Sequence, residues 1–108
     1  MPTMPTIRVV AKRPGLPAEV VDIPNTLEGI KSQLDDACIC GIRLNREVTG
    51  YCDDEGLLKE LPLNFILHGE PIVGPVVFSK VNGEGEEIGF DDEAEALDLC
   101  QKLNGGRV

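Results

Sequence analysis

Hydrophobic and polar residues alternate over several short segments, which is typical of strands with one buried face. The pattern predicts strands over residues 6–12, 19–23, 37–44, 47–52 and 72–81. In the first strand Ile7, Val9 and Ala11 share a face. In the third strand Cys38, Cys40, Ile42 and Leu44 share a face. Turns are expected at residues 13–17, at Asn45 (with a positive φ) and at residues 82–83, and Pro75 predicts a bulge, a bend or an edge position.

Two segments have helical spacing instead. Residues 26–34 follow Asn25, a suitable N-cap, and should place Leu27, Ile30 and Leu34 on the sheet. A last helix is expected from Asp91 or Asp92 to Leu103, with a buried stripe of Ala96, Leu97, Cys100 and Leu103. The hydrophobic spacing of residues 57–67 suits neither period, so we expect a loop-like crossover that packs on the core.

These elements predict one α+β domain, with a mainly antiparallel sheet of about five strands and two helices packed on one face. A length of 108 residues suits a single core. We expect a disordered tail over residues 1–6, the domain over 7–104 and a flexible C-terminus over 105–108.

Composition bears on the compartment and on the four cysteines. The chain has neither an apolar run of about 20 residues nor the features of a signal peptide at its start, so we expect a cytoplasmic protein with reduced thiols. Cys38, Cys40 and Cys52 could together approach a zinc ion, but no second cysteine pair exists. We therefore predict small buried thiols, no metal and no cofactor.

Charge is the most uneven property of the chain. Residues 1–50 hold six basic and six acidic side chains, whereas residues 51–108 hold four and thirteen, which accounts for the net charge of −9. Eight of these carboxylates fall within fifteen residues that contain no Lys or Arg: Glu84, Glu86, Glu87, Asp91, Asp92, Glu93, Glu95 and Asp98. Such a field repels nucleic acid and anionic lipid and attracts basic protein surfaces.

No set of catalytic residues can be assembled from the sequence. The glycines of residues 83–89 are spaced G-x-G-x-x-x-G around three glutamates that would oppose a phosphate. Residues 53–56 lack the remaining ligands of a calcium loop, and His68, Ser32 and Ser79 stand in no recognisable catalytic context. We therefore predict that the protein is not an enzyme.

One segment carries a more specific pattern. Cys52, Asp53, Glu55, Gly56, Leu61, Pro62 and Asn64 follow a leading strand and an Asn-Thr-Leu-Glu start, and precede the segment Val73-Gly-Pro-Val-Val-Phe78. In this order, over roughly residues 7–90, the chain resembles domain-of-unknown-function family 3846. The resemblance implies an origin in phages, plasmids or gut-type bacteria and implies no catalytic residue. The motif residues are expected to be mainly structural, with a ligand pocket as the alternative.

Three functions remain open from the sequence. The first is an anti-defence inhibitor of a phage or mobile element, similar in action to an anti-CRISPR protein, whose acidic residues occupy the basic nucleic-acid channel of a host nuclease. The second is a binder of a small ligand or nucleotide signal in a cavity beneath residues 57–67, with Arg8, Arg43 or Arg46 as anion contacts. The third is a domain whose acidic face serves only solubility.

Overall fold

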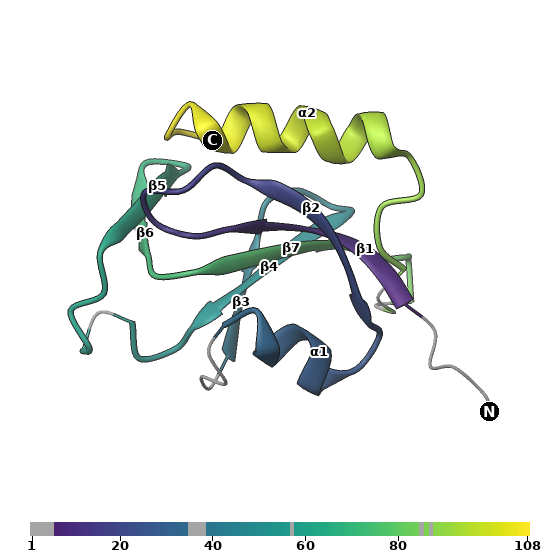
Figure 1. Ribbon diagram of the computed structural model, residues 1–108, viewed down its shortest axis with the longest axis horizontal. Coiled ribbons are helices and arrows are strands. Elements are labelled where there is room, and N and C mark those ends of the chain that lie inside the picture. The colour runs from purple at the N-terminus through teal and green to yellow at the C-terminus, as the bar shows by residue number, and fades with distance from the viewer. Residues whose placement is uncertain (1–5, 35–38, 57, 85, 87) are drawn as a thin grey trace.

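The computed structural model describes residues 6–34, 39–56, 58–84, 86 and 88–108 (Figure 1). Five antiparallel strands form the main sheet in the order β2 (Glu19–Pro24), β1 (Thr6–Lys12), β7 (Val76–Lys80), β4 (Val48–Asp53) and β3 (Ile39–Arg43). A second sheet pairs β5 (Leu63–Leu67) with β6 (Glu70–Val73), and the helices are α1 (Leu27–Ser32) and α2 (Glu93–Asn104). The predicted α+β class and the antiparallel sheet are confirmed.

The two helices lie on opposite faces of the main sheet, so the prediction of two helices on one face is wrong (Figure 1). Val9 and Val77 belong to the cluster that α1 covers, whereas Val10 and Phe78 belong to the cluster that α2 covers. Successive apolar residues in β1 and β7 thus point to both faces. A strand that is buried on both sides needs a layer on each of them.

The segment from residue 63 to residue 80 contains a hairpin and a separate strand. His68 and Gly69, with φ values of 48° and 84°, form the tight turn between β5 and β6. The predicted loop-like crossover over residues 57–67 did not include this hairpin. The predicted strand over residues 72–81 is in fact two strands in different sheets. Gly74, at a φ of 75°, and Pro75 separate β6 from β7, because a left-handed residue followed by a residue without an N–H ends the ladder.

Three local predictions are corrected. Thr26, rather than Asn25, caps α1 and accepts a hydrogen bond from the Gly29 amide. Asn45 turns the chain without a positive φ, because its side chain accepts bonds from the amides of Glu47 and Val48. Leu97 is 48% exposed and Leu99 is buried in its place, since Ala96, Leu99, Cys100 and Leu103 follow the helical period more closely. The Leu27 side chain and Cys38 lie outside the described residues.

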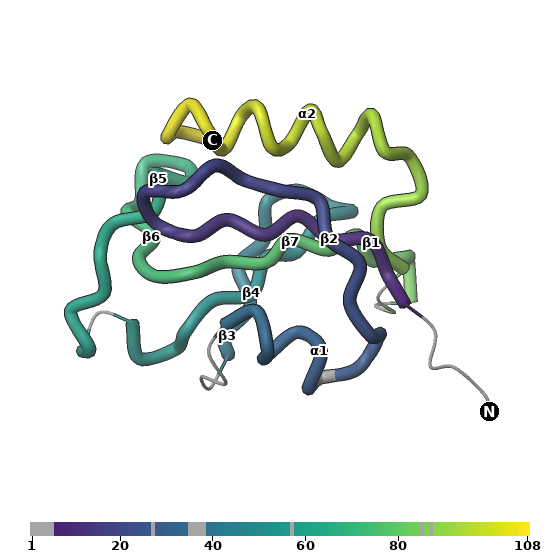
Figure 2. Tube along the Cα trace, in the orientation of Figure 1, coloured from purple at the N-terminus to yellow at the C-terminus, as the bar shows by residue number. Residues whose placement is uncertain are grey.

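The C-terminal residues continue the small sheet beside β5 (Figure 2). The amide of Ile66 donates to the Gly106 carbonyl at 2.9 Å, and the amide of Val108 donates to the Ile66 carbonyl at 2.7 Å. These bonds contradict the flexible end expected for residues 105–108, because the edge of β5 offers unpaired backbone groups that the chain end can satisfy. Thr6 already belongs to β1, and residues 1–5 lie outside the described part.

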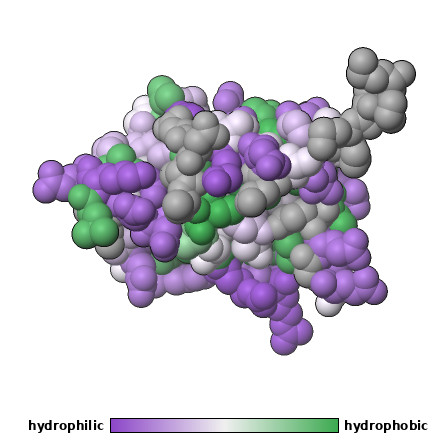
Figure 3. Space-filling model, turned by 90° about the horizontal axis from the view of Figure 1, so that it is seen from below, coloured by the Kyte–Doolittle hydropathy of each residue, from purple (hydrophilic) through white to green (hydrophobic). Residues whose placement is uncertain are grey.

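The face that α1 covers carries hydrophobic residues only in small separate groups among hydrophilic ones (Figure 3). The large hydrophobic side chains that are exposed in the described part of the chain are Leu16, Leu58, Leu63, Ile88 and Leu97. In the part of the chain that is described, neither helix has the length and apolar character needed to cross a membrane.

Candidate functional site: an acidic face and a hydrogen-bonded motif

The acidic residues singled out in the sequence gather at one end of the long axis of the molecule. They lie on the connection from β7 to α2 and on the first turns of α2, whereas the β5–β6 hairpin lies at the other end (Figure 1). We call the described members of this set, Glu84, Glu86, Asp91, Asp92, Glu93, Glu95 and Asp98, the acidic face. Glu87 lies outside the described residues.

The connection that carries the acidic face is tied to the sheet at both ends. At its start the Val81 amide donates to the Glu47 carbonyl at 2.7 Å, and at its end the Phe90 amide donates to the Arg8 carbonyl at 2.8 Å. Between them the side-chain oxygen of Asn82 accepts bonds from the amides of Glu84 and Glu86. Gly89 has a φ of 71°, and a Cβ there would lie 2.9 Å from the backbone of Arg8. Only glycine therefore allows the connection to approach β1 so closely.

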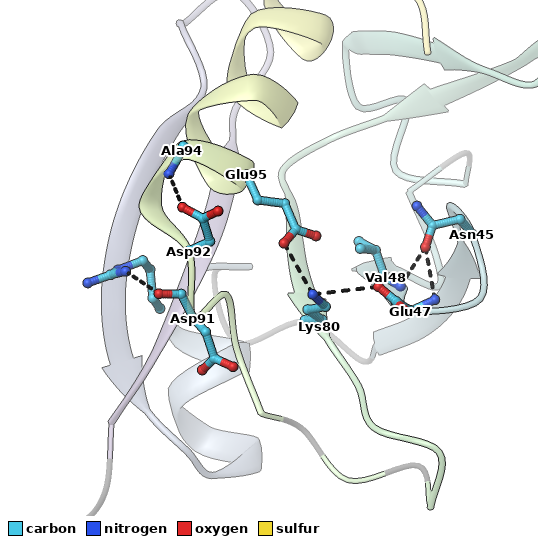
Figure 4. A network of polar contacts seen from close by, with 9 residues as sticks. Asn45, Glu47, Val48, Lys80, Asp91, Asp92, Ala94 and Glu95 are labelled. Atoms are coloured by element: carbon cyan, nitrogen blue, oxygen red, sulfur yellow. Dashed lines mark hydrogen bonds and ion pairs between the residues drawn. The ribbon is translucent and has the colours of Figure 1, made fainter.

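Most carboxylates of the acidic face are open to solvent. Glu84, Glu86, Asp91 and Glu93 are exposed, and within the described part of the chain none of them forms an ion pair. Asp92 is the N-cap of α2 and accepts a bond from the Ala94 amide at 2.9 Å (Figure 4). A carboxylate at this position also interacts favourably with the helix dipole.

Two members of the acidic face are partly neutralised by lysines. Lys80 lies 3.1 Å from a Glu95 oxygen and 3.5 Å from a Glu47 oxygen, so it joins α2 to the β3–β4 hairpin (Figure 4). The hydrogen bond to Glu95 raises the pKa of Lys80 above its ordinary value. Lys102 pairs with Asp98 one helical turn away at 3.1 Å. The unpaired charge therefore lies toward the start of α2 and the connection before it.

The motif residues lie away from the acidic face, and their first polar group is the Asp53 carboxylate. One oxygen accepts a bond from the Glu55 amide at 2.8 Å, and the other lies 2.8 Å from the Lys59 Nζ. The bond from Lys59 lowers the pKa of Asp53 below its ordinary value despite the burial of the side chain. Asp53 thus fixes the turn that leaves β4.

The middle of the motif packs against the junction of β6 and β7. A Cβ on Gly56 would meet the Val73 side chain at 3.0 Å, and a Cβ on Gly74 would meet the Leu61 side chain at 2.7 Å. The Gly74 amide donates to the Pro62 carbonyl at 2.9 Å. The two glycines therefore leave room for Leu61 between two stretches of backbone.

Asn64 completes the motif and connects three segments. Its amide nitrogen donates to the carbonyls of Lys12 and Gly74 at 2.9 and 2.8 Å, and its oxygen accepts a bond from the Lys12 Nζ at 3.0 Å. Lys12 is a buried residue that the sequence analysis missed. Its signal was the two-residue spacing from Val10, which places both side chains on the inner face toward α2.

Of the cysteines that the structure describes, two lie side by side, and neither they nor His68 belong to a group that could hold a metal ion within the described residues. The sulfurs of Cys40 and Cys52 lie 3.2 Å apart on facing strands, and burial followed by the bond with Cys40 raises the pKa of Cys52 to about 12. Among the described residues no three His, Cys, Asp or Glu side chains are placed to hold a metal ion. His68 is exposed, with its Nε2 3.2 Å from the Leu44 carbonyl.

The three arginines proposed as anion contacts lie on β1, on β3 and in the turn after β3. Arg8 donates to the Asp91 carbonyl at 3.3 Å and borders a cavity of about 380 Å³ that Asp22 and Asp91 also line. Arg43 and Arg46 are exposed on β3 and in the turn that follows it. An anion site formed by these side chains stays a prediction.

Comparison with known proteins identifies one family. The model of the family described as Domain of unknown function (DUF3846) matches residues 7–103, a range that extends the expected resemblance through most of α2. No curated protein and no solved structure matches the chain.

Proposed function

The chain belongs to the DUF3846 family, a domain of unknown function, and from this premise we propose that it is a non-enzymatic interaction protein whose acidic face binds a basic protein surface. One observation carries the proposal. Glu84, Glu86, Asp91 and Glu93 are exposed and, within the described part of the chain, free of ion pairs; the first three stand on the connection that is tied to the sheet, and Glu93 begins α2. Fixed charges of one sign favour a partner of the opposite sign.

Two exposed hydrophobic side chains support a protein partner over a nucleic acid. Ile88 and Leu97 are 40% and 48% exposed, and they lie in sequence among the acidic residues. Protein interfaces combine apolar contacts with a charged rim. Negative charge at the same place repels phosphate groups, so the acidic face disfavours direct binding of DNA or RNA.

The most specific form of the proposal is an anti-defence protein of a phage or mobile element. In this form the acidic face occupies the basic nucleic-acid channel of a host nuclease, such as a CRISPR effector, and excludes its substrate. The sign of the charge and the family resemblance support this form. The alternative is an acidic face that contributes only solubility.

A pull-down from a defence-positive host, followed by titration of the purified partner at several salt concentrations, tests the proposal. Binding should weaken steeply between low and high salt, because screening shortens the reach of the charges to about 8 Å at physiological ionic strength. A partner that is bound equally well at all salt concentrations would show that the acidic face is not the contact.

Matched variants separate the acidic face from net charge. Both variants replace three exposed glutamates or aspartates by their amides, one set on the acidic face and one set elsewhere: Glu84, Glu86 and Glu93, or Asp54, Glu60 and Glu70. The first variant should lose binding, because it removes charges of the acidic face, and the second should retain it. Since both variants have the same net charge, a difference between them assigns the contact to the acidic face. Equal losses would indicate a nonspecific charge effect.

A further inference from the structure

Lys12 is a buried cation whose hydrogen-bond partners are both neutral. The residue is 6% exposed, and its Nζ donates to the Arg13 carbonyl at 2.9 Å and to the Asn64 side-chain oxygen at 3.0 Å. No carboxylate pairs with it among the described residues. An ammonium group carries three donors, and burying a charge is costly unless it is paired. Burial accordingly lowers the pKa of Lys12.

Lys12 lines an open cavity of about 510 Å³. Leu16 and Pro17 give it exposed apolar walls, the buried Leu103 borders it, and Lys12, Asn64 and Asn104 give it polar walls. No Asp or Glu that the structure describes lines it, although the whole chain carries a net charge of −9. Its volume is within the range of small-molecule sites.

Asn104 adds a donor to the same cavity. Its side-chain oxygen accepts a bond from the Ala18 amide at 2.7 Å. The Asn104 amide nitrogen has no partner within the described part of the chain. This nitrogen can therefore donate a hydrogen bond to a ligand. Two kinds of donor, one of them charged, therefore border a space that no carboxylate of the described residues lines.

We propose that this cavity binds a small organic monocarboxylate. The carboxylate accepts bonds from the Lys12 Nζ and the Asn104 amide, and its apolar body lies against Leu16 and Pro17. A multiply charged phosphate fits less well, because Lys12 is the only cation that lines the cavity among the described residues. The C-terminal end of α2, which carries partial negative charge, also borders it. This site is independent of the acidic face.

NMR titration of the labelled protein with butyrate, at constant ionic strength, tests the assignment. Butyrate should shift the Asn104 side-chain amide and the Leu16 methyl groups along a saturable curve. Butyramide, which has the same shape without the charge, and inorganic phosphate should bind more weakly. Equal shifts with butyrate and butyramide, or the absence of saturable shifts at these residues with butyrate, would overturn the proposal.

Substitutions locate the site. Lys12→Met should weaken butyrate binding about tenfold or more, because a charge-assisted hydrogen bond is lost, whereas the control Lys31→Met should leave it unchanged. Leu16→Glu offers a second test that does not alter the buried network, since Leu16 is 56% exposed at the cavity. The new carboxylate should compete for Lys12, whereas Leu58→Glu, at an 83% exposed position, should not. Unchanged binding in Leu16→Glu would refute the site.

Discussion

Two sets of polar residues in this chain have opposite environments. On the acidic face Glu84, Glu86, Asp91 and Glu93 point into solvent and have no ionic partner in the described part of the chain. In the motif, by contrast, Asp53 and Asn64 use their side-chain oxygens and nitrogens within the protein. The first set can therefore serve a partner without loss to the fold, and the second set holds the fold together.

The contrast also separates two kinds of pattern in the sequence. The motif is the more specific pattern, yet its residues are engaged in turns, close contacts and a bridge between segments. The acidic run is a matter of composition, yet its side chains are the more accessible. A specific pattern thus indicates a demanding local structure, and accessibility decides which residues can bind.

The largest effect is expected at the bridge between segments. Asn64→Ala should lower the free energy of unfolding by about 3 kcal/mol, because the Lys12 ammonium and two carbonyl groups lose a partner. Urea denaturation measures the loss. Asn45→Ala is the matched control, since Asn45 also loses two bonds but is exposed, and about 1 kcal/mol is expected there. Equal losses in the two variants would show that the part-buried bonds of Asn64 contribute no more to stability than the exposed bonds of Asn45.

The buried thiol of the motif predicts a loss of stability in alkali. The pKa of Cys52 is raised from 9.0 to about 12, so the folded thiol stays neutral where the unfolded one is ionised. The contribution of the Cys52 thiol to the free energy of unfolding should be fully present below pH 9. Above pH 9 it should fall by about 1.4 kcal/mol per pH unit. Denaturation of Cys52→Val between pH 8 and 10 should show a shallower decline. A decline as steep as in the parent protein would contradict the role of Cys52.

The Asp53 carboxylate predicts the opposite sign in acid. Its pKa is lowered in the folded state, so its contribution is present above the ordinary value of 3.8 and is lost as the pH falls below it. Asp53→Asn should lower the free energy of unfolding at pH 7 by only about 1 kcal/mol, because solvent screens the half-exposed Lys59. The free energy of unfolding of the variant should also fall less steeply in acid. The exposed Asp54→Asn is the control and should behave as the parent protein.

The smallest effect is expected on the acidic face. Replacing Glu84, Glu86 and Glu93 by glutamine should change the free energy of unfolding by no more than about 0.5 kcal/mol. Added salt should raise the melting temperature of the parent protein slightly, by screening the repulsion among these carboxylates, and should raise that of the variant less. Loss of more than 1 kcal/mol in the variant would show that these residues support the fold.

Local patterns were sufficient for several elements. The strand at residues 6–12, the hairpin to the strand that follows and the last helix were placed close to their observed bounds. The β5–β6 hairpin was missed, because its turn residues His68 and Gly69 are not among the strongest hairpin dipeptides. The candidate acidic residues could be named in advance, but the pairing of Glu95 with Lys80 and Glu47 could not.

The sequence by itself determined the antiparallel α+β class, the main turns and the concentration of negative charge, because these follow from the identity and spacing of neighbouring residues. The tertiary structure alone decided that the helices cover opposite faces of the sheet. It also decided that Lys12 is buried against Asn64, 52 residues further along the chain. The physical reason is that burial and pairing arise between segments brought together by the whole core, and periodicity within a segment shows which faces are apolar but not what covers them.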